Sequence, residues 1–323
     1  MDQILQAVAV VIPIIFVLVF GFSAQKWKAF GTEVNPIPVI NNLVLKFALP
    51  PTLFVGTIIV TREQLTHDLI LFLVLIIALL IAYFFGFLVA KLLFKRNNIE
   101  SSIAGLAVSF SAGPFYGPAL LGSLYGAESG VAVSIISLVI NVFIVPLATI
   151  IIKLNLANKE DKHDSMIKLI GISLYEAIFK TPFVWAPLLA FILVFLGIKM
   201  PDVVNNSLDL IGKATAGLAV FVAGMTIAAN KFKLNGEVLL FALLKNIGLP
   251  ILFIGIAMLL NMTKESVIFD QGLLLAALPS GPMIVLLATR YQQYQQQASS
   301  ILAVSTVGML ITVTTLIYLL NPA

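Results

Sequence analysis

The chain has 323 residues, of which 60% are hydrophobic and 11% are charged, and its mean hydropathy is +1.08. Soluble domains carry about a quarter charged residues, so this composition excludes a soluble globular protein. The apolar runs are long and continuous rather than alternating, which excludes a β-barrel and predicts an all-α polytopic membrane protein. The chain has no cysteine, and its two histidines, His67 and His163, fall in predicted loops. We therefore expect no thiol chemistry and no intramembrane metal site.

With about 20 apolar residues per span, the sequence predicts ten transmembrane helices. The first begins without a basic segment or cleavage motif, so we interpret it as a retained helix. The longest connection comprises a charged loop at 155–164 and an amphipathic interfacial helix at 165–180. It separates a first five-helix unit (1–153) from a second one (181–323), with 154–180 between them. The ten predicted spans are 3–24, 38–60, 68–92, 101–124, 128–152, 181–198, 205–229, 236–260, 268–289 and 298–320.

The basic residues at the ends of these spans and between them are distributed unevenly, with thirteen at odd-numbered connections and three at even-numbered ones. Cytoplasmic loops of membrane proteins carry the excess of lysine and arginine. We therefore expect odd connections to be cytoplasmic and both termini to face outward in the cell's inner (plasma) membrane. The asymmetry also explains the net charge of +4, so no nucleic-acid partner is expected. The even-side residues are Arg62, Lys199 and Lys264; the odd-side residues are Lys26, Lys28, Lys91, Lys95, Arg96, Lys153, Lys159, Lys162, Lys168, Lys180, Lys231, Lys233 and Arg290.

Two of the predicted spans contain a Ser-(Ala)-Gly-Pro break, at 109–118 and at 278–282. Proline removes a backbone donor and glycine tolerates unusual backbone conformations, so each helix is predicted to be interrupted at membrane depth. Unwound backbone survives there only where protein encloses it or where it lines a cavity. Paired interruptions at corresponding places are typical of a transporter's binding site.

The two halves share features at a nearly constant offset. Lys46-x3-Pro50 corresponds to Lys213-x3-Gly217 at an offset of 167, and Gly113-Pro114 corresponds to Gly281-Pro282 at an offset of 168. Because each half has five spans, the halves must run in opposite directions through the membrane. The sequence therefore predicts two inverted five-helix repeats, whose broken helices 4 and 9 enter from opposite sides.

Four stretches carry a resemblance to a known family: 41–55 (NNLVLKFALPPTLFV), 180–187 (KTPFVWAP), 217–226 (GLAVFVAGMT) and 278–282 (LPSGP). They resemble the auxin efflux carrier family, more closely its bacterial malate, malonate and oxalate permease-like members, and the resemblance covers essentially the whole chain. It implies a scaffold domain (spans 1, 2, 6 and 7) and a mobile transport domain (spans 3–5 and 8–10), with crossing broken helices and elevator-type alternating access. It also implies a small organic-anion substrate, commonly a dicarboxylate, and a homodimer formed through the scaffold.

Beyond each break a new half-helix begins, and its first N–H groups lack intrahelical partners. Such helix N-termini bind anions, so two of them meeting at one point suit a substrate with two carboxylates. The alternative is that these are ordinary proline kinks, with 113–117 a close helix contact. The candidate binding residues at the breaks are Ser111, Gly113, Pro114, Gly117, Ser280, Gly281 and Pro282.

Three lysines fall inside predicted spans, where a charge is costly and usually faces a cavity or a partner. Lys46 and Lys213 occupy equivalent positions in the two halves, and we expect them to face the anion path or to cap carbonyls at the breaks. Lys213 also follows Asp209 by one helical turn, so a surface ion pair is the alternative. Lys245 precedes Asn246 and Pro250 and is a further candidate.

Two more polar residues are candidates. The amide of Asn141, inside the fifth span, suits either ligand contact or a hydrogen bond between helices. Arg290, near the cytoplasmic end of the ninth span, suits either a gate for anions or a positive-inside anchor.

The predicted function is secondary transport of a small carboxylate such as malate, malonate or oxalate. No catalytic constellation lies in the spans, so no enzyme and no cofactor are expected. No histidine or carboxylate is clearly placed as a proton relay. This leaves open proton coupling through a substrate that carries its own proton, sodium coupling through backbone carbonyls at the breaks, uniport and anion exchange. The alternatives are a carrier of the same fold for a monocarboxylate, an auxin-like acid or a sodium-coupled substrate, and an anion channel.

Overall fold

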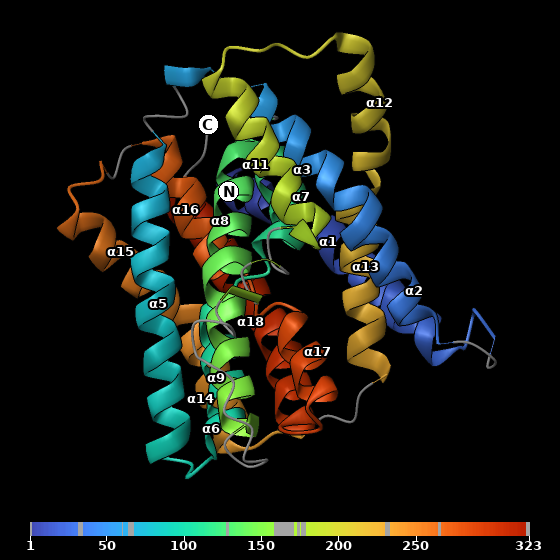
Figure 1. The fold of residues 1–323 in the computed structure, drawn as a ribbon. Coiled ribbons are helices and arrows are strands. Elements are labelled where there is room, and N and C mark those ends of the chain that lie inside the picture. Colours follow the sequence, from blue (N-terminus) through green and yellow to red (C-terminus); the bar gives the residue numbers. More distant parts are fainter. Residues whose placement is uncertain are drawn as a thin grey trace.

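The computed structural model describes residues 2–31, 35–59, 61–63, 68–126, 129–157, 171–172, 175, 179–229, 233–263 and 266–320 (Figure 1). Within these ranges every regular element is a helix, as the composition predicts, and the one β-type pairing recorded is an isolated bridge. Several sequence expectations concern residues outside these ranges, namely His67, His163, Lys159, Lys162, Lys168, Lys231, Lys264 and most of the expected interfacial helix.

The first half of the chain contains α1 (Asp2–Lys26), α2 (Pro36–Leu43), η1 (Val44–Ala48), α3 (Leu49–Ile58), α5 (Leu69–Leu92), α6 (Asn98–Ser109), α7 (Gly113–Tyr125), α8 (Gly130–Leu138), η3 (Val139–Ile144) and α9 (Val145–Ala157). The second half contains α11 (Pro182–Phe195), α12 (Asp202–Gly212), α13 (Ala214–Ala229), α14 (Gly236–Leu243), η4 (Leu244–Gly248), α15 (Leu249–Leu259), α16 (Val267–Ala277), α17 (Met283–Arg290) and α18 (Gln295–Leu320).

Among the described residues, six continuous helical stretches are long and apolar enough to cross a membrane, namely 36–58, 69–92, 130–156, 202–229, 236–259 and 295–320. Shorter apolar helices cover 12–26, 182–195 and 267–277. The predicted breaks are present, since α6 ends before α7 begins at Gly113, and α16 ends before α17 begins at Met283. One boundary was wrong: α9 continues through Ala157, so the first residues of the expected loop at 155–164 are helical.

Three membrane-length helices contain a π-helical turn, η1, η3 or η4, directly ahead of a proline. In each, the residue before the proline donates its N–H to the carbonyl five residues back: Leu49 to Val44, Val145 to Ile140 and Leu249 to Leu244. Proline has no N–H and crowds the preceding turn, so the widened turn accommodates it without ending the helix.

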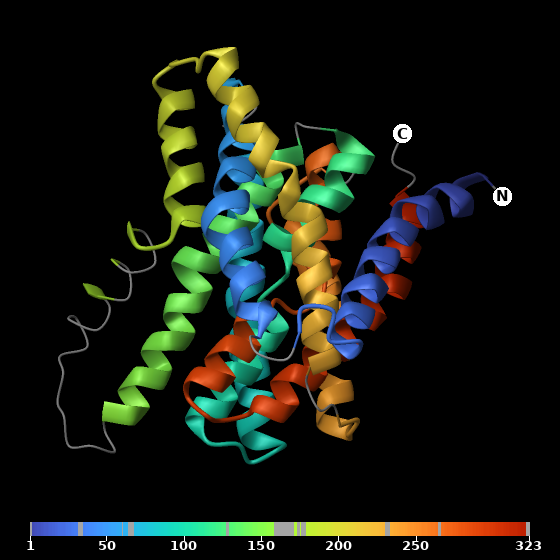
Figure 2. The ribbon, with the colours of Figure 1, turned by 90° about the vertical axis from the view of Figure 1, so that its right-hand side faces the viewer.

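Glycines allow close helix contacts in several places. A Cβ on Gly21 of α1 would lie 2.0 Å from the carbonyl oxygen of Phe221 in α13, and a Cβ on Gly224 would lie equally close to that of Leu18. Small residues at helix interfaces permit this approach, which membrane proteins use in place of a hydrophobic driving force. Helix α1 also packs beside α18, and the start of α1 lies at the same end of the molecule as the end of α18 (Figure 2).

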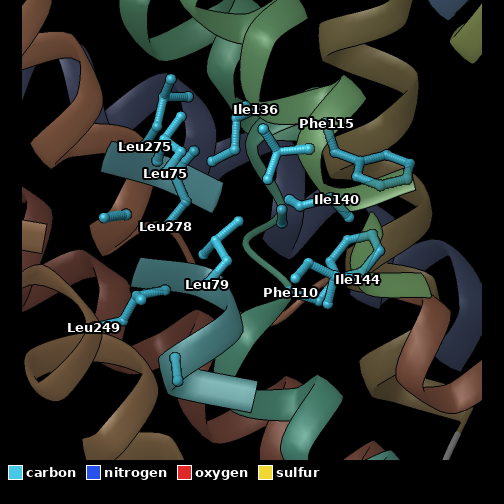
Figure 3. Packing of buried hydrophobic residues seen from close by; sticks show 14 of the residues in the cluster. Leu75, Leu79, Phe110, Phe115, Ile136, Ile140, Ile144, Leu249, Leu275 and Leu278 are labelled. Atoms are coloured by element: carbon cyan, nitrogen blue, oxygen red, sulfur yellow. The ribbon is translucent and has the colours of Figure 1, made fainter. Parts of the chain in front are cut away.

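The core lies around the broken helices. Buried side chains converge there from α5 (Leu75), from α8 and η3 (Ile136 and Ile140) and from α16 (Leu275), and the ring of Phe110 lies among them (Figure 3). Dense packing on all sides encloses the unwound backbone that lipid would not tolerate.

Candidate functional site

The two breaks lie directly against each other. Ser111 and Ser280 form an isolated antiparallel bridge. The N–H of Ala112 donates to the carbonyl of Pro279 at 2.8 Å, and the N–H of Gly281 donates to the carbonyl of Phe110 at 3.1 Å. The unwound segments therefore satisfy each other's backbone groups, which explains how they persist in an apolar core.

The two serines hold the crossing together. The hydroxyl of Ser111 donates to the carbonyl of Leu275 near the end of α16, and the hydroxyl of Ser280 donates to the carbonyl of Ala107 near the end of α6. Both serines are fully buried. Each satisfies a carbonyl that the opposite broken helix leaves without an intrahelical partner, so their hydroxyl hydrogens are engaged within the protein.

The glycines at the two breaks have different surroundings. A Cβ on Gly281 would lie 1.8 Å from Cε1 of the Phe110 ring, so no other residue fits there without displacing that ring. Gly113 and Gly117 face side chains of α8, with a Cβ on Gly113 falling 2.7 Å from Cγ2 of Ile136. The pair at 113–117 thus packs closely against α8 and against Leu275 of α16.

The half-helices α7 and α17 both begin at the crossing. Their first N–H groups, on Gly113 and Met283, have no intrahelical partner, and no side-chain hydrogen bond caps either helix. The N-terminal end of a helix carries about half a positive charge. Two such ends at one point make the crossing attractive to anions.

A small cavity of about 20 Å³ adjoins the crossing. This volume accommodates about one water molecule, so the site is nearly closed in this conformation. Its lining comes from α2, η1, α3, the crossing itself, α7, η3, α11 and α17, and comprises Asn41, Leu45, Leu49, Phe110, Pro114, Phe115, Asn141, Phe183, Pro282, Met283 and Leu286. Among the predicted candidates, Pro114, Pro282 and Asn141 line this cavity.

Two asparagine amides line the cavity. Asn141 is buried in η3, and one of its side-chain N–H groups donates to the carbonyl of Ser137 at 2.8 Å. Its second N–H and its side-chain oxygen remain available to a ligand. Asn41 lies in α2 and was missed by the sequence analysis. A signal existed, because two consecutive asparagines at 41–42 inside a predicted span are unusual for a helix in lipid.

The intramembrane lysines differ in exposure. The Lys213 side chain is 74% exposed at the joint between α12 and α13 and pairs with Asp209 at 2.7 Å. Lys46 is exposed in η1, although its neighbour Leu45 lines the cavity. Lys245 is fully buried in η4, and its ammonium donates to the carbonyl of Ala276 at 2.8 Å, one residue before the end of α16. Arg290, at the end of α17, is exposed with its guanidinium 5.8 Å from the ring centre of Tyr291.

A larger hollow of about 620 Å³ lies away from the crossing, between the end of α3 and the connection from α11 to α12. Arg62, Lys199 and Asp202 contribute to its lining. It contains none of the broken-helix residues, so we place the candidate site at the smaller cavity.

A partly buried ion pair joins three segments at one end of the bundle. Arg96, between α5 and α6, donates to both carboxylate oxygens of Glu237 at the start of α14, at 3.0 and 2.6 Å. The hydroxyl of Tyr294, between α17 and α18, donates to the same carboxylate at 2.7 Å. The hydrogen bonds to Glu237 raise the pKa of Arg96, and burial raises the pKa of Tyr294, so both keep their protons at neutral pH. The α5–α6 and α17–α18 connections and the start of α14 therefore meet at one end of the bundle.

Within the part of the chain that the structure describes, no group of three or more His, Cys, Asp or Glu residues is placed to bind a metal ion. The polar groups around the crossing are instead amides, hydroxyls, backbone N–H groups and one ammonium. This chemistry suits an anion.

The chain matches the family model described as a membrane transport protein over residues 6–318. It is 31% identical over 309 residues to YfdV, an uncharacterized transporter of Escherichia coli strain K12, covering 95% of each chain. It is also 25% identical over 285 residues to a protein of Rhizobium meliloti (strain 1021) named "Putative malonate transporter", covering 87% of this chain and 86% of that one. Its helices agree with a protein that crosses the membrane several times. The chain therefore belongs to the auxin efflux carrier family of membrane transport proteins.

Proposed function

We propose that this protein is a secondary transporter of small organic anions, of the dicarboxylate class that includes malonate, malate and oxalate. The anion binds at the crossing of the broken helices and moves by elevator-like alternating access. The observation that carries this proposal is the direct pairing of Ser111 with Ser280, since it brings the N-termini of α7 and α17 to one point.

That arrangement supports the size and charge of the proposed substrate. Two helix N-termini offer one carboxylate site each, and the amides of Asn41 and Asn141 offer hydrogen bonds beside them. The nearly closed cavity requires the surrounding helices to part before a dicarboxylate enters. The name of the relative from Rhizobium meliloti supports malonate as the first compound to test.

The architecture that we propose is ten spans in two inverted five-helix repeats, 1–153 and 181–323. The reciprocal hydrogen bonds of Ser111 and Ser280 support it. In this arrangement spans 1, 2, 6 and 7 form the scaffold, and spans 3–5 and 8–10 form the transport domain. The cluster of Arg96, Glu237 and Tyr294 supports that division, because all three segments that it joins belong to the transport domain.

Within the same proposal the protein lies in the inner (plasma) membrane with both termini outside, forms a homodimer through the scaffold and needs no cofactor. Lys46, Lys213 and Arg290 are exposed in the chain as described, so in this scheme they attract anions toward the path rather than line the cavity.

The first experiment measures thermal unfolding of the purified protein with malonate, malate, oxalate, acetate and indole-3-acetate, each with and without sodium. A ligand that binds the folded state raises the unfolding temperature according to its occupancy. We expect the dicarboxylates to give larger shifts than acetate at equal concentration. A larger shift with either monocarboxylate, or no shift with any dicarboxylate, contradicts the proposed substrate class. Saturable counter-transport in proteoliposomes then separates a carrier from a channel.

A disulfide tests the mechanism. The bonds of Ala112 and Gly281 flank the bridge, so residues 111 and 280 form a non-hydrogen-bonded antiparallel pair, whose Cα atoms lie about 4.5 Å apart, within the range of a disulfide. The double variant Ser111→Cys/Ser280→Cys should crosslink in this cysteine-free chain. We expect the oxidised variant to transport as fast as its reduced form, since an elevator moves both broken helices together. Loss of transport only on oxidation argues that they separate instead.

A further inference from the structure

Lys245 has an unusual environment for a lysine. Its side chain is fully buried in η4, and among the described residues its ammonium contacts one partner, the carbonyl of Ala276 at 2.8 Å. The ion pairs recorded among those residues do not include it. An ammonium brings three donors, so two of them have no protein acceptor within the described chain.

The neighbouring elements offer Lys245 no counter-charge. The titratable acids on the helices packed against η4 are Glu237 of α14, Asp270 of α16 and Glu100 of α6. Glu237 and Glu100 pair with Arg96, and Asp270 lies six residues before Ala276, near the opposite end of α16. Burying a charge without a paired charge costs free energy, so the charged form of Lys245 depends on whatever negative charge comes near it.

A substrate carboxylate bound at the crossing would bring a negative charge close to the end of α16. Ala276 lies four residues before Ser280, and four residues of extended chain span at most about 14 Å. A carboxylate held at the crossing therefore lies close enough to interact with the ammonium through a medium of low dielectric constant. The corresponding helix of the first half has no such group, because α5 has no charged residue between Leu69 and Ala90.

We propose that Lys245 is the proton-coupling group of this carrier, gaining a proton from water on its Nζ atom when the anion binds and returning it when the anion leaves. The proposal rests on the proposed function. Binding of the proton and binding of the anion are linked, so each must raise the affinity for the other by the same factor. Lys245 interacts with the bound anion electrostatically, without contacting it. It is therefore a positioning residue.

The test measures proton uptake when malonate is added to the purified protein in weakly buffered solution at about pH 7.5, where both carboxylates of malonate are ionised. Wild-type protein should take up a fraction of a proton, up to one, per malonate bound. Lys245→Arg should bind malonate without proton uptake, because arginine does not lose its proton. Lys245→Met should bind malonate about tenfold more weakly, without proton uptake.

Lys91→Met is the matched control, because Lys91 lies exposed at the end of α5 and its loss changes the net charge equally. It should keep both the affinity and the proton uptake of the wild-type protein. Thermal unfolding of every variant without ligand reports whether it is folded. Should Lys245→Arg fail to fold in its buried site, Lys245→Met still decides the question.

The outcomes separate the two proposals. If no carboxylate raises the unfolding temperature of the wild-type protein, the proposed function fails and this inference fails with it. If malonate binds without proton uptake, or if Lys245→Met takes up protons as the wild-type protein does, the inference alone is overturned. If Lys245→Met loses stability and affinity together while Lys245→Arg still takes up protons, Lys245 is only a structural cap of α16.

Discussion

The two broken segments, α6–α7 and α16–α17, share one backbone arrangement and differ in the groups that surround it. Each gives a serine hydroxyl to a carbonyl of the other. However, Gly281 lies against the ring of Phe110, whereas Gly113 faces the aliphatic side chain of Ile136. Among the described residues, only the end of α16 also receives a buried side-chain amino group, from Lys245. The difference teaches that two similar backbone arrangements can be surrounded by different chemical groups. Both the closer glycine contact and the buried lysine amino group belong to the second break.

The largest effect is expected from Gly281→Ala. The new methyl group would overlap the Phe110 ring, and we expect a loss of about 3 kcal/mol or more. Gly113→Ala meets aliphatic atoms of Ile136 and Leu275 at longer distances, from 2.7 to 3.4 Å, so we expect a smaller loss of about 1 kcal/mol. Thermal unfolding and the yield of monodisperse protein check both values. Phe110→Ala should partly rescue Gly281→Ala, and equal losses at the two glycines would remove the packing difference between the breaks.

Glu237→Gln should give the next largest effect. It leaves Arg96 at 25% exposure without the carboxylate that binds it through two nitrogens, which we expect to cost about 2 kcal/mol after allowance for solvent. Glu100→Gln is the control, since Glu100 lies 3.6 Å from Arg96 and is more exposed than Glu237. Its loss should stay below about 0.5 kcal/mol. Comparable losses in thermal unfolding would show that the cluster does not fasten the segments of the two halves.

The two serines allow a direct comparison of the breaks. Ser280→Ala leaves the carbonyl of Ala107 without a donor, at an expected cost of about 2 kcal/mol. Ser111→Ala leaves the carbonyl of Leu275 without a donor likewise, but the amino group of Lys245 remains at that helix end, so we expect about 1 kcal/mol. The order of the two unfolding temperatures is the measurement. The reverse order would mean that Lys245 does not support α16.

The smallest effect is expected from Lys213→Gln. This charge also belongs to the second half, but it is 74% exposed and pairs with Asp209 one turn away. We expect less than about 0.5 kcal/mol in thermal unfolding and no change in proton uptake on malonate binding. A strong effect on proton uptake would indicate that Lys213, rather than Lys245, is the proton-coupling residue.

The sequence predicted the breaks correctly because their cause is local. Glycine followed by proline at 113–114 and at 281–282 favours an interruption of the helix, although the same pair at 117–118 lies inside α7. It did not predict the pairing of Ser111 with Ser280, or that these hydroxyls reach opposite carbonyls, because both depend on how distant helices pack. For the same reason the sequence could not show which of the intramembrane lysines is buried, since that depends on the rotation of each helix.

The π-helical turns bear on that rotation. A π turn holds one residue more than an α turn, so it acts as a one-residue insertion and advances the phase of all that follows by about 100°. Lys46, Asn141 and Lys245 each lie in such a turn. Counting from a loop in steps of 3.6 residues therefore assigns the wrong face beyond each turn. A homologue that lacked one residue there would keep its sequence motifs and still present a different side chain to the crossing.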